Sequence, residues 1–558
     1  MTLHGLRLEL AHPRTSVQLC VLGIIAGMSA ASLIILFRLC YEWLQLQVLS
    51  GVGDYASVPW FVRILMPLIG VVGILLIAYM TGLKHYRLGI PFVIHRVKYH
   101  FGHIPLGTTI NQFFGGMIAL ASGFAVGREG PSVHLGAAGS SFIGQWLKLP
   151  FNSIRILAGC GIAAGISASF NTPFAAVIFV MEVVLREYKI HIFVPVMLAA
   201  ACGSLLTRAV FGEFNELAFL AFNTIDTWMY LYLVLFGILL GFLASLFNRN
   251  LMFVMRLFSK VSIHWRLLLA SVITAAAGSI LPQAMGASFE SVQALFEQDP
   301  GILLLALVLF VKFLLTITAL GLGIPGGIMG PVMVLGMISG ALLLVPISYF
   351  VDVEGLNSSF ALLGVAGMLT AVLHAPLAAL SAVMELSYSP EIILPAMLVI
   401  VPAYVTSTQL LKNRSIFIQQ LDYQKLPYAT SSVREALQKT GVLAAMDTEF
   451  KIFYDAPDKA ILAFLDKAPT HPVVQRSSFE IDVQYMLVGY NVSLEHDANP
   501  LLYSSMEGLS SQATLSEVYD ALQSTRSGAV YIYQDEHENL LGVITWNMLQ
   551  GYLMKEQY

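Results

Sequence analysis

Hydrophobic residues form long runs over the first three quarters of the chain, and polar residues are confined to the stretches between them. A membrane-spanning helix needs about 20 apolar residues to cross a hydrocarbon core of roughly 30 Å. Several runs are shorter than this and many contain glycine, proline or asparagine, which predicts short, broken and tilted membrane helices. The runs are residues 16–37, 61–83, 108–126, 132–147, 154–183, 190–211, 228–247, 266–286, 301–322, 328–349, 359–384 and 391–411.

One polar stretch, residues 127–131 (GREGP), interrupts an apolar region. Ionisable residues at membrane depth are costly to bury and are functional candidates by default. The glycines permit unusual backbone conformations, and Pro131 suits the first turn of a new helix, where its missing N–H costs nothing. The stretch therefore predicts a broken helix whose second half begins near Pro131 and whose free N–H groups suit an anion. The Glu129 carboxylate is a tethered anion for that same site.

The break has a counterpart 200 residues later. Residues 327–331 (GIMGP) share its Gly-x-x-Gly-Pro pattern, and both copies continue to a Leu-Gly pair. The segments PFAAVIFVME, ending at Glu182, and PLAALSAVME, ending at Glu385, also match in register at a spacing of 203 residues. Gly-rich turns recur in membrane helices by chance, but two matches at nearly one spacing favour a true repeat. Interrupted helices at corresponding positions indicate a transport site near the membrane midplane.

Composition agrees with a membrane protein. Of 558 residues, 57% are hydrophobic and only 11% are charged, whereas a soluble protein carries about 25% charged residues. We therefore expect a polytopic α-helical protein in a lipid membrane. The net charge of −4 implies no nucleic-acid partner. The chain has no HExxH motif, and no paired catalytic acids or Ser-His-Asp arrangement stands out, so we expect no enzyme activity.

Basic residues mark one side of the membrane. They gather at residues 84–98 and at residues 249–266. Because cytoplasmic loops carry an excess of Lys and Arg, we expect these loops and both termini in the cytoplasm. The polar N-terminus leads into a long apolar run without a small-residue cleavage site. The expected location is the cell (inner) membrane, with multiple passes.

Charged residues become frequent and long apolar runs stop after about residue 422. Two αββα-like patterns follow, at residues 445–490 and 510–557, and the second one contains the strands GAVYIYQ and LLGVIT. We expect a small α/β cytoplasmic domain that is either an assembly module or a ligand sensor. The expected boundaries are an N-terminal segment (1–15), a transmembrane domain (16–425, with repeats at roughly 16–211 and 228–421) and a tail (426–558).

Four stretches together resemble the CLC family of chloride channels and chloride/proton antiporters: GREGPSVHLGAAG, AGISASFNTPFAAVIFVMEV, GIPGGIMGPVMVLG and AGMLTAVLHAPLAALSAVMEL. The resemblance covers roughly residues 15–425, and the tail is similar to the paired CBS domains of many CLC proteins. It implies an all-α membrane fold of two inverted repeats with broken helices. It also implies a homodimer with one pore per subunit, each pore holding a central anion among helix N-termini.

The resemblance also implies roles for individual residues. Glu129 matches the family's gating glutamate, whose carboxylate competes with the anion and swings away when it is protonated or displaced. Arg128 would shape the local positive field. The other anion-binding positions fall in residues 87–91, in residues 327–331 and near Phe417. The implied anion-binding set is Leu88, Gly89, Ile90, Arg128, Glu129, Gly130, Ile328, Met329 and Phe417.

Three positions depart from the family pattern. Leu88 stands in place of a serine and Phe417 in place of a tyrosine, so two hydroxyl donors are missing, and Met329 replaces a phenylalanine. The N–H groups of Ile328 and Met329 remain suitable, because a backbone amide does not depend on its side chain. A buried anion without donors is costly, so we expect a weakened central site. The departures leave the order of anion selectivity open.

Antiporters of the family usually carry an internal glutamate one residue after the Met-Glu position, where this chain has Val183. Valine cannot carry a proton, and the family's channels resemble the chain at this position. We therefore expect a passive, CLC-type chloride channel with Glu129 as its gate. A proton-coupled anion antiporter is the alternative, because another acid or a water chain can relay protons. A cation-coupled solute transporter with broken helices is a second alternative.

No cofactor is expected in the tail. The family's nucleotide-binding CBS copies often end in Thr-x-x-Asp after a strand, and the aspartate holds a ribose. This chain has Thr545-Trp546-Asn547-Met548 there and lacks the acid. The expected ligands are therefore chloride or other small anions, with protons as a gating ligand, and an adenine nucleotide is not expected to bind strongly.

Overall fold

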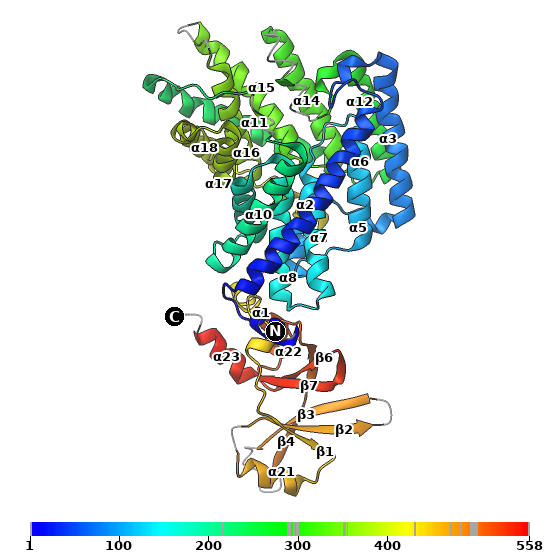
Figure 1. The fold of residues 1–558 in the computed structure, drawn as a ribbon, viewed down its shortest axis with the longest axis vertical. Coiled ribbons are helices and arrows are strands. Elements are labelled where there is room, and N and C mark those ends of the chain that lie inside the picture. Colours follow the sequence, from blue (N-terminus) through cyan, green and yellow to red (C-terminus); the bar gives the residue numbers. More distant parts are fainter. Residues whose placement is uncertain are drawn as a thin grey trace. The chain divides into compact units, whose positions relative to one another are not determined.

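The computed structural model divides into two compact units, each described here by itself. The membrane unit comprises Cys20–Ile143 and Ile156–Tyr428, and the tail unit comprises Met1–Leu19, Gly144–Arg155 and Ala429–Tyr558 (Figure 1). The structure describes residues 3–213, 217, 219–286, 289, 292–293, 296, 301–349, 353, 355–428, 431–468, 471–479, 482–490 and 500–555.

Helices form the membrane unit throughout its described length. Nine of the described helices are long and apolar enough to cross a membrane. The helices are α2 (Val17–Leu46), α3 (Trp60–Thr81), α4 (Gly89–Tyr99), α5 (Leu106–Ile110), α6 (Gly116–Ala121), α7 (Glu129–Trp146), α8 (Phe151–Phe170), α9 (Pro173–Phe179), α10 (Ile190–Phe211), α11 (Tyr230–Leu257), α12 (Ile263–Ile280), α14 (Ile302–Leu322), α15 (Met329–Ser348), α16 (Asn357–Leu373), α17 (Pro376–Ser387), α18 (Ile393–Val405) and α19 (Ile416–Gln424).

The predicted breaks are present. Both Gly-x-x-Gly-Pro stretches end one segment and start the next, because α7 begins at Glu129 and α15 begins at Met329. Further interruptions are turns of π-helix, which are frequent at functional sites. They occur at η3 (Asn111–Gly115), η4 (Val180–Leu185) and η8 (Thr406–Leu410).

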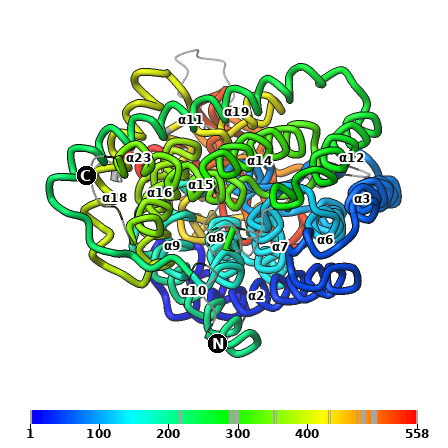
Figure 2. Tube along the Cα trace, turned by 90° about the horizontal axis from the view of Figure 1, so that it is seen from above, coloured from blue at the N-terminus to red at the C-terminus, as the bar shows by residue number. Residues whose placement is uncertain are grey.

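The second half of each repeat consists of equivalent helices. The series α7 to α10 corresponds to the series α15 to α18 in order and in motif. The halves also touch directly, because α9 packs against α17. Around this contact, α11, α16 and α18 pack against one another on one side of the unit (Figure 2).

The Leu-Gly pair shared by the two repeats marks a close helix crossing. A Cβ on Gly136 of α7 would overlap the carbonyl oxygen of Gly161 of α8, and a Cβ on Gly336 of α15 would lie 2.7 Å from the carbonyl oxygen of Gly364 of α16. Only glycine allows backbones to approach this closely. The repeated glycine therefore fixes the same crossing in both halves.

The tail unit is α/β, as predicted. Its strands form two sheets, β1-β2-β3-β4 and β5-β6-β7, and each sheet pairs its first two strands in parallel and the others antiparallel. The elements are α1 (Leu3–Ala11), α20 (Ser432–Leu437), β1 (Lys451–Tyr454), α21 (Asp458–Leu465), β2 (Val473–Phe479), β3 (Asp482–Tyr490), β4 (Leu501–Ser505), β5 (Glu507–Ser510), α22 (Leu515–Leu522), β6 (Ala529–Gln534), β7 (Glu536–Thr545) and α23 (Trp546–Lys555).

The second αββα pattern is confirmed by α22, β6, β7 and α23. Its helix starts with a capping box, because the side chains of Thr514 and Glu517 bond each other's backbone N–H groups. The first predicted pattern, at residues 445–490, contains α21, β2 and β3, but β1 and β4 extend its two central strands into a four-stranded sheet that the pattern did not predict.

Asn152 ties three distant segments of the tail unit together. Its Nδ2 donates to the carbonyl oxygens of Leu10 (3.1 Å), Ala11 (3.3 Å) and Lys439 (3.1 Å). The side chain is buried, so losing it removes three hydrogen bonds from the interior of the tail unit. The N-terminal helix α1 is therefore anchored to the first turn of α8.

We predict that Asn152→Ala loosens the N-terminal segment. Tryptic cleavage at Arg7 or Arg14 should become about tenfold faster, because local opening then costs less free energy. Ser153→Ala is the matched control, since Ser153 Oγ gives Leu10 a single bond of 2.8 Å. Equal cleavage rates in wild type and both variants would contradict the anchoring role.

Candidate functional site

The two helix breaks are hydrogen-bonded to each other. The N–H of Gly127 donates to the carbonyl oxygen of Gly327 (2.8 Å), and the N–H of Gly327 donates to the carbonyl oxygen of Gly127 (2.6 Å). This is an isolated antiparallel bridge. It brings the N-termini of α7 and α15, one from each repeat, to one point inside the membrane unit.

The Glu129 carboxylate occupies that point. Its side chain is 1% exposed, and it accepts hydrogen bonds from its own N–H and from the N–H of Gly330 in the first turn of α15. A helix N-terminus attracts negative charge through its free N–H groups and its dipole. The glutamate of one repeat therefore fills the anion site at the helix of the other.

Three glycines surround this carboxylate. A Cβ on Gly127 or on Gly327 would overlap Oε2, and a Cβ on Gly330 would lie 2.6 Å from Oε1. The glycines of both breaks thus provide the space that the carboxylate fills. Oε2 is buried and has no hydrogen-bond partner among the described residues, which is a costly arrangement for a carboxylate oxygen. The Glu129 carboxylate is therefore held in this position through one oxygen only.

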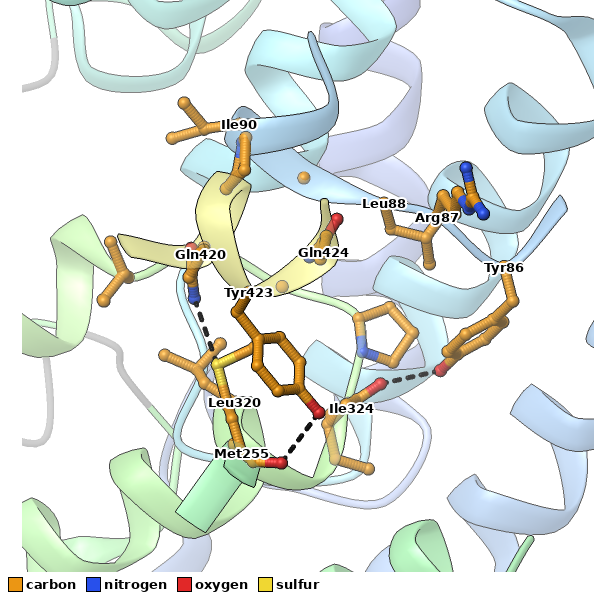
Figure 3. Close-up of a pocket in the computed structure, with 18 of the residues that line it drawn as sticks. Tyr86, Arg87, Leu88, Ile90, Met255, Leu320, Ile324, Gln420, Tyr423 and Gln424 are labelled. Atoms are coloured by element: carbon orange, nitrogen blue, oxygen red, sulfur yellow. Dashed lines mark hydrogen bonds between the residues drawn. The ribbon is translucent and has the colours of Figure 1, made fainter. Parts of the chain in front are cut away.

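A cavity of about 370 Å³ lies on one side of the paired breaks. It gathers three of the four predicted anion-binding segments, because Leu88, Gly89 and Ile90 line it together with Ile328 and Phe417. Figure 3 shows Leu88 and Ile90 opposite the α19 side chains Gln420, Tyr423 and Gln424.

This first cavity is positively charged. Arg87 and Arg266 line it, and no Asp or Glu is among its lining residues. One sign of charge in a cavity with low-dielectric walls raises the local concentration of anions. The charge of the first cavity, called the anion vestibule below, therefore favours anions.

A second, smaller cavity of about 50 Å³ lies at Glu129 itself. Arg128 lines it, donates to the hydroxyl of Tyr41 (3.1 Å) and stacks 4.7 Å from the Phe170 ring centroid. These contacts hold the guanidinium beside the carboxylate. Arg128 therefore makes structural contacts and also places a positive charge beside Glu129.

Three other predicted anion-binding residues, Gly89, Gly130 and Met329, have different surroundings. The N–H of Gly89 already donates to Oε1 of buried Gln112 (2.9 Å), so this amide is engaged within the protein. Gly130 lies where the two breaks approach most closely, with its Cβ position 2.7 Å from the carbonyl oxygen of Gly326. Met329 lines a separate apolar cavity.

Phe417 is buried and makes an edge-to-face contact with Phe179 at a centroid distance of 6.5 Å. It lines the first cavity and also a cavity of about 430 Å³ that contains Glu182, Val183 and His374. Its ring therefore lines both cavities without offering a hydroxyl to either.

Glu182 and Glu385 each bond the start of a helix in the other repeat. Glu182 accepts hydrogen bonds from the N–H groups of Leu377 (3.2 Å) and Ala378 (2.7 Å), in the first turn of α17. Glu385 accepts from Phe174 (2.9 Å) and Ala175 (2.7 Å), in the first turn of α9. Each glutamate ends one copy of the repeated Pro…Met-Glu segment. It caps the helix with which the other copy of that segment begins.

Three residues around the site were not predicted from the sequence: Gln112, which accepts from the Gly89 N–H, Arg266, which lines the first cavity, and His374, which lines the cavity that contains Val183. Gln112 and His374 are polar residues within or beside apolar runs, and this signal was available because such residues are costly in a membrane. Arg266 was assigned only to a basic loop. The positions of these residues depend on tertiary packing, which the sequence does not reveal.

Comparison with known proteins identifies the family. The model of the voltage gated chloride channel family matches residues 69–408. The chain belongs to this family, the CLC family. It is accordingly an integral membrane protein with several passes.

Curated CLC proteins align over most of the chain. A ClcB-like chloride channel protein of Ralstonia nicotianae is 28% identical over 407 residues, which cover 70% of this chain and 93% of the relative. An H⁺/Cl⁻ exchange transporter ClcA of Cronobacter sakazakii is 26% identical over 416 residues, covering 70% and 86%. Among solved structures, a slow cyanobacterial Cl⁻/H⁺ antiporter superposes with a TM-score of 0.64 at 22% identity, covering 74% of this chain and 98% of that one.

We predict that the two helix caps, Glu182 on α17 and Glu385 on α9, stabilise the membrane unit to the same extent. Glu182→Ala and Glu385→Ala should each lower the free energy of unfolding by about 1–2 kcal/mol, because each leaves two N–H groups at a helix start without an acceptor. Thermal unfolding in detergent measures this loss. Glu391→Ala is the control, since Glu391 is exposed, and a Glu385→Ala protein as stable as this control would refute the cap.

Proposed function

We propose that the chain exchanges chloride for protons across the membrane, with the Glu129 carboxylate as the group that both blocks the anion and carries the proton. The observation that carries this proposal is the position of Glu129 between the paired breaks. Its carboxylate occupies N–H groups that would otherwise face an anion, and it borders the second cavity. Exchange by the ClcA relative and by the cyanobacterial antiporter favours coupled transport over the passive channel expected from Val183.

The anion path in this proposal runs through the two cavities around the breaks. The first cavity reaches Gly327 and Ile328, and the second reaches Gly127, Glu129 and Gly330. An anion arriving in the first cavity competes with the carboxylate for the N-terminus of α15. Protonation removes the charge of Glu129 and so weakens its hold on those N–H groups, which lets the anion pass.

The proton path does not need an acid at position 183. Val183 lines the 430 Å³ cavity together with Glu182 and His374. A third cavity of about 40 Å³ extends from Leu373 to Phe170 and Met329, beside the breaks. That volume has room for about two or three waters. Because its lining is apolar, hydration is transient, and the proposal therefore implies slow proton transfer.

The proposal includes the expected setting of the protein. The chain would act as a homodimer in the cell membrane with one pore in each subunit, and the basic residues at the end of α11 would lie on the cytoplasmic side.

Reconstituted liposomes test the coupling. We predict that an outward chloride gradient drives protons inward against their own gradient in the wild-type protein. Glu129→Gln should reduce this proton movement about a hundredfold, because an amide cannot carry the proton, while chloride flux persists. Proton uptake is followed with a pH-sensitive dye and chloride with an ion-selective electrode.

Two results would refute exchange. A reversal potential at the chloride Nernst value, unchanged by a pH gradient, would identify the passive channel instead. An absence of any chloride-dependent current would point to the cation-coupled solute transporter.

A second variant tests the gate without altering the glutamate. The three atoms nearest to a Cβ on Gly127 all belong to the Glu129 carboxyl group, so the added methyl group of Gly127→Ala acts first on the carboxylate. We predict a severalfold rise in chloride flux and a weaker pH dependence. In a Glu129→Ala background the same substitution should change nothing, and an equal rise there would show that the added methyl group acts by another route.

A further inference from the structure

A basic cavity of about 400 Å³, distinct from the first cavity, lies at the end of α11. It is formed where the C-terminal turns of α11 meet the chain that leaves η8 and the start of α19. Its lining residues are Arg249, Arg256, Leu411, Lys412, Asn413, Arg414, Gln419, Asp422 and Tyr423.

The cavity carries four basic side chains and one acidic side chain, a net charge of +3. Arg414 pairs with Asp422 (2.7 Å), and Arg249 donates to the carbonyl oxygen of Leu411 (2.9 Å). Arg256 and Lys412 are exposed and have no hydrogen bond or ion pair to any described residue. Two positive charges thus remain for a ligand.

A series of hydrogen bonds holds the wall of the cavity in place. Gln419 Nε2 donates to Asn413 Oδ1 (3.0 Å), and Asn413 Nδ2 donates to Ser407 Oγ (3.0 Å). Ser407 in turn donates to the carbonyl oxygen of Ala371 (2.9 Å). This buried chain of bonds fixes the turn that presents Lys412 next to the two arginines of α11.

Apolar side chains continue from the basic residues along the same helices. Leu246 and Phe253 alternate with Arg249 and Arg256 at intervals of three and four residues, so all four share one face of α11. Leu246 is 52% exposed and Phe253 is 61% exposed, and Leu410 at the end of η8 is 66% exposed. In a membrane protein, such a face lies against acyl chains and its basic end lies at the headgroups.

We propose that this cavity binds the phosphate headgroup of an anionic phospholipid, with Arg256 and Lys412 as the principal ligands and an acyl chain along Leu246 and Phe253. A free phosphate would use the same charges but would leave the apolar face unoccupied. Basic cavities between membrane helices are suited to anionic headgroups. The lipid would sit beside the transport path, because Tyr423 lines both this cavity and the anion vestibule.

Native mass spectrometry of the full chain tests the proposal. Bound lipid is counted in detergent micelles doped with phosphatidylglycerol or with phosphatidylcholine. We expect selective retention of phosphatidylglycerol, and roughly thirtyfold weaker retention by the double variant Arg256→Gln/Lys412→Gln, the fold-change for two basic charges at a membrane surface. Lys260→Gln, which alters a nearby base outside the cavity, should match wild type.

The variants are expected to fold, since neither mutated side chain bonds to a described residue, and thermal unfolding in phosphatidylcholine alone verifies this. Equal retention of phosphatidylglycerol by wild type and the double variant would overturn the site. Inorganic phosphate that stabilises the detergent-solubilised protein as strongly as phosphatidylglycerol would assign the cavity to a soluble anion and overturn the lipid.

Discussion

Everything at the candidate site depends on two backbone hydrogen bonds between Gly127 and Gly327. Each helix break alone exposes N–H groups that a membrane cannot solvate. The antiparallel bridge joins the breaks, so that the N-termini of α7 and α15 face a common space. Because both partners are glycine, that space accepts a carboxylate. The carboxylate site is thus a product of the two repeats together, and neither break would create it alone.

A second pair of carboxylates, those of Glu182 and Glu385, also joins the two repeats at helix N-termini. Glu182 and Glu385 each satisfy the start of a helix in the opposite repeat. A carboxylate at a helix N-terminus gains from both hydrogen bonds and the dipole. The chain therefore uses glutamates at helix starts in two ways. At the caps, both carboxylate oxygens are bonded and the groups are structural, whereas at Glu129 one oxygen is unpaired and the group is held less firmly.

The sequence predicted the breaks, the repeats and the α/β tail, because glycine, proline and hydrophobic periodicity act locally. It could not predict which breaks pair, since the partners are 200 residues apart. The engaged amide of Gly89 was also hidden, because its acceptor Gln112 lies in a π-helical turn that orients the side chain. Val183 suggested a channel, but a missing acid at one position says nothing about cavities beside it, which arise from packing.

The two helix caps also bear on how the protein is made. The acceptor of the Phe174 N–H lies 211 residues further along the chain. At a synthesis rate of 5–20 residues per second, the ribosome needs roughly 10–40 s to reach it. During that interval α9 has entered the membrane with its first N–H groups unsatisfied. The first repeat therefore lacks the acceptor for the first N–H groups of α9 until Glu385 has been synthesised. Until then, these N–H groups need water or the insertion machinery as a partner.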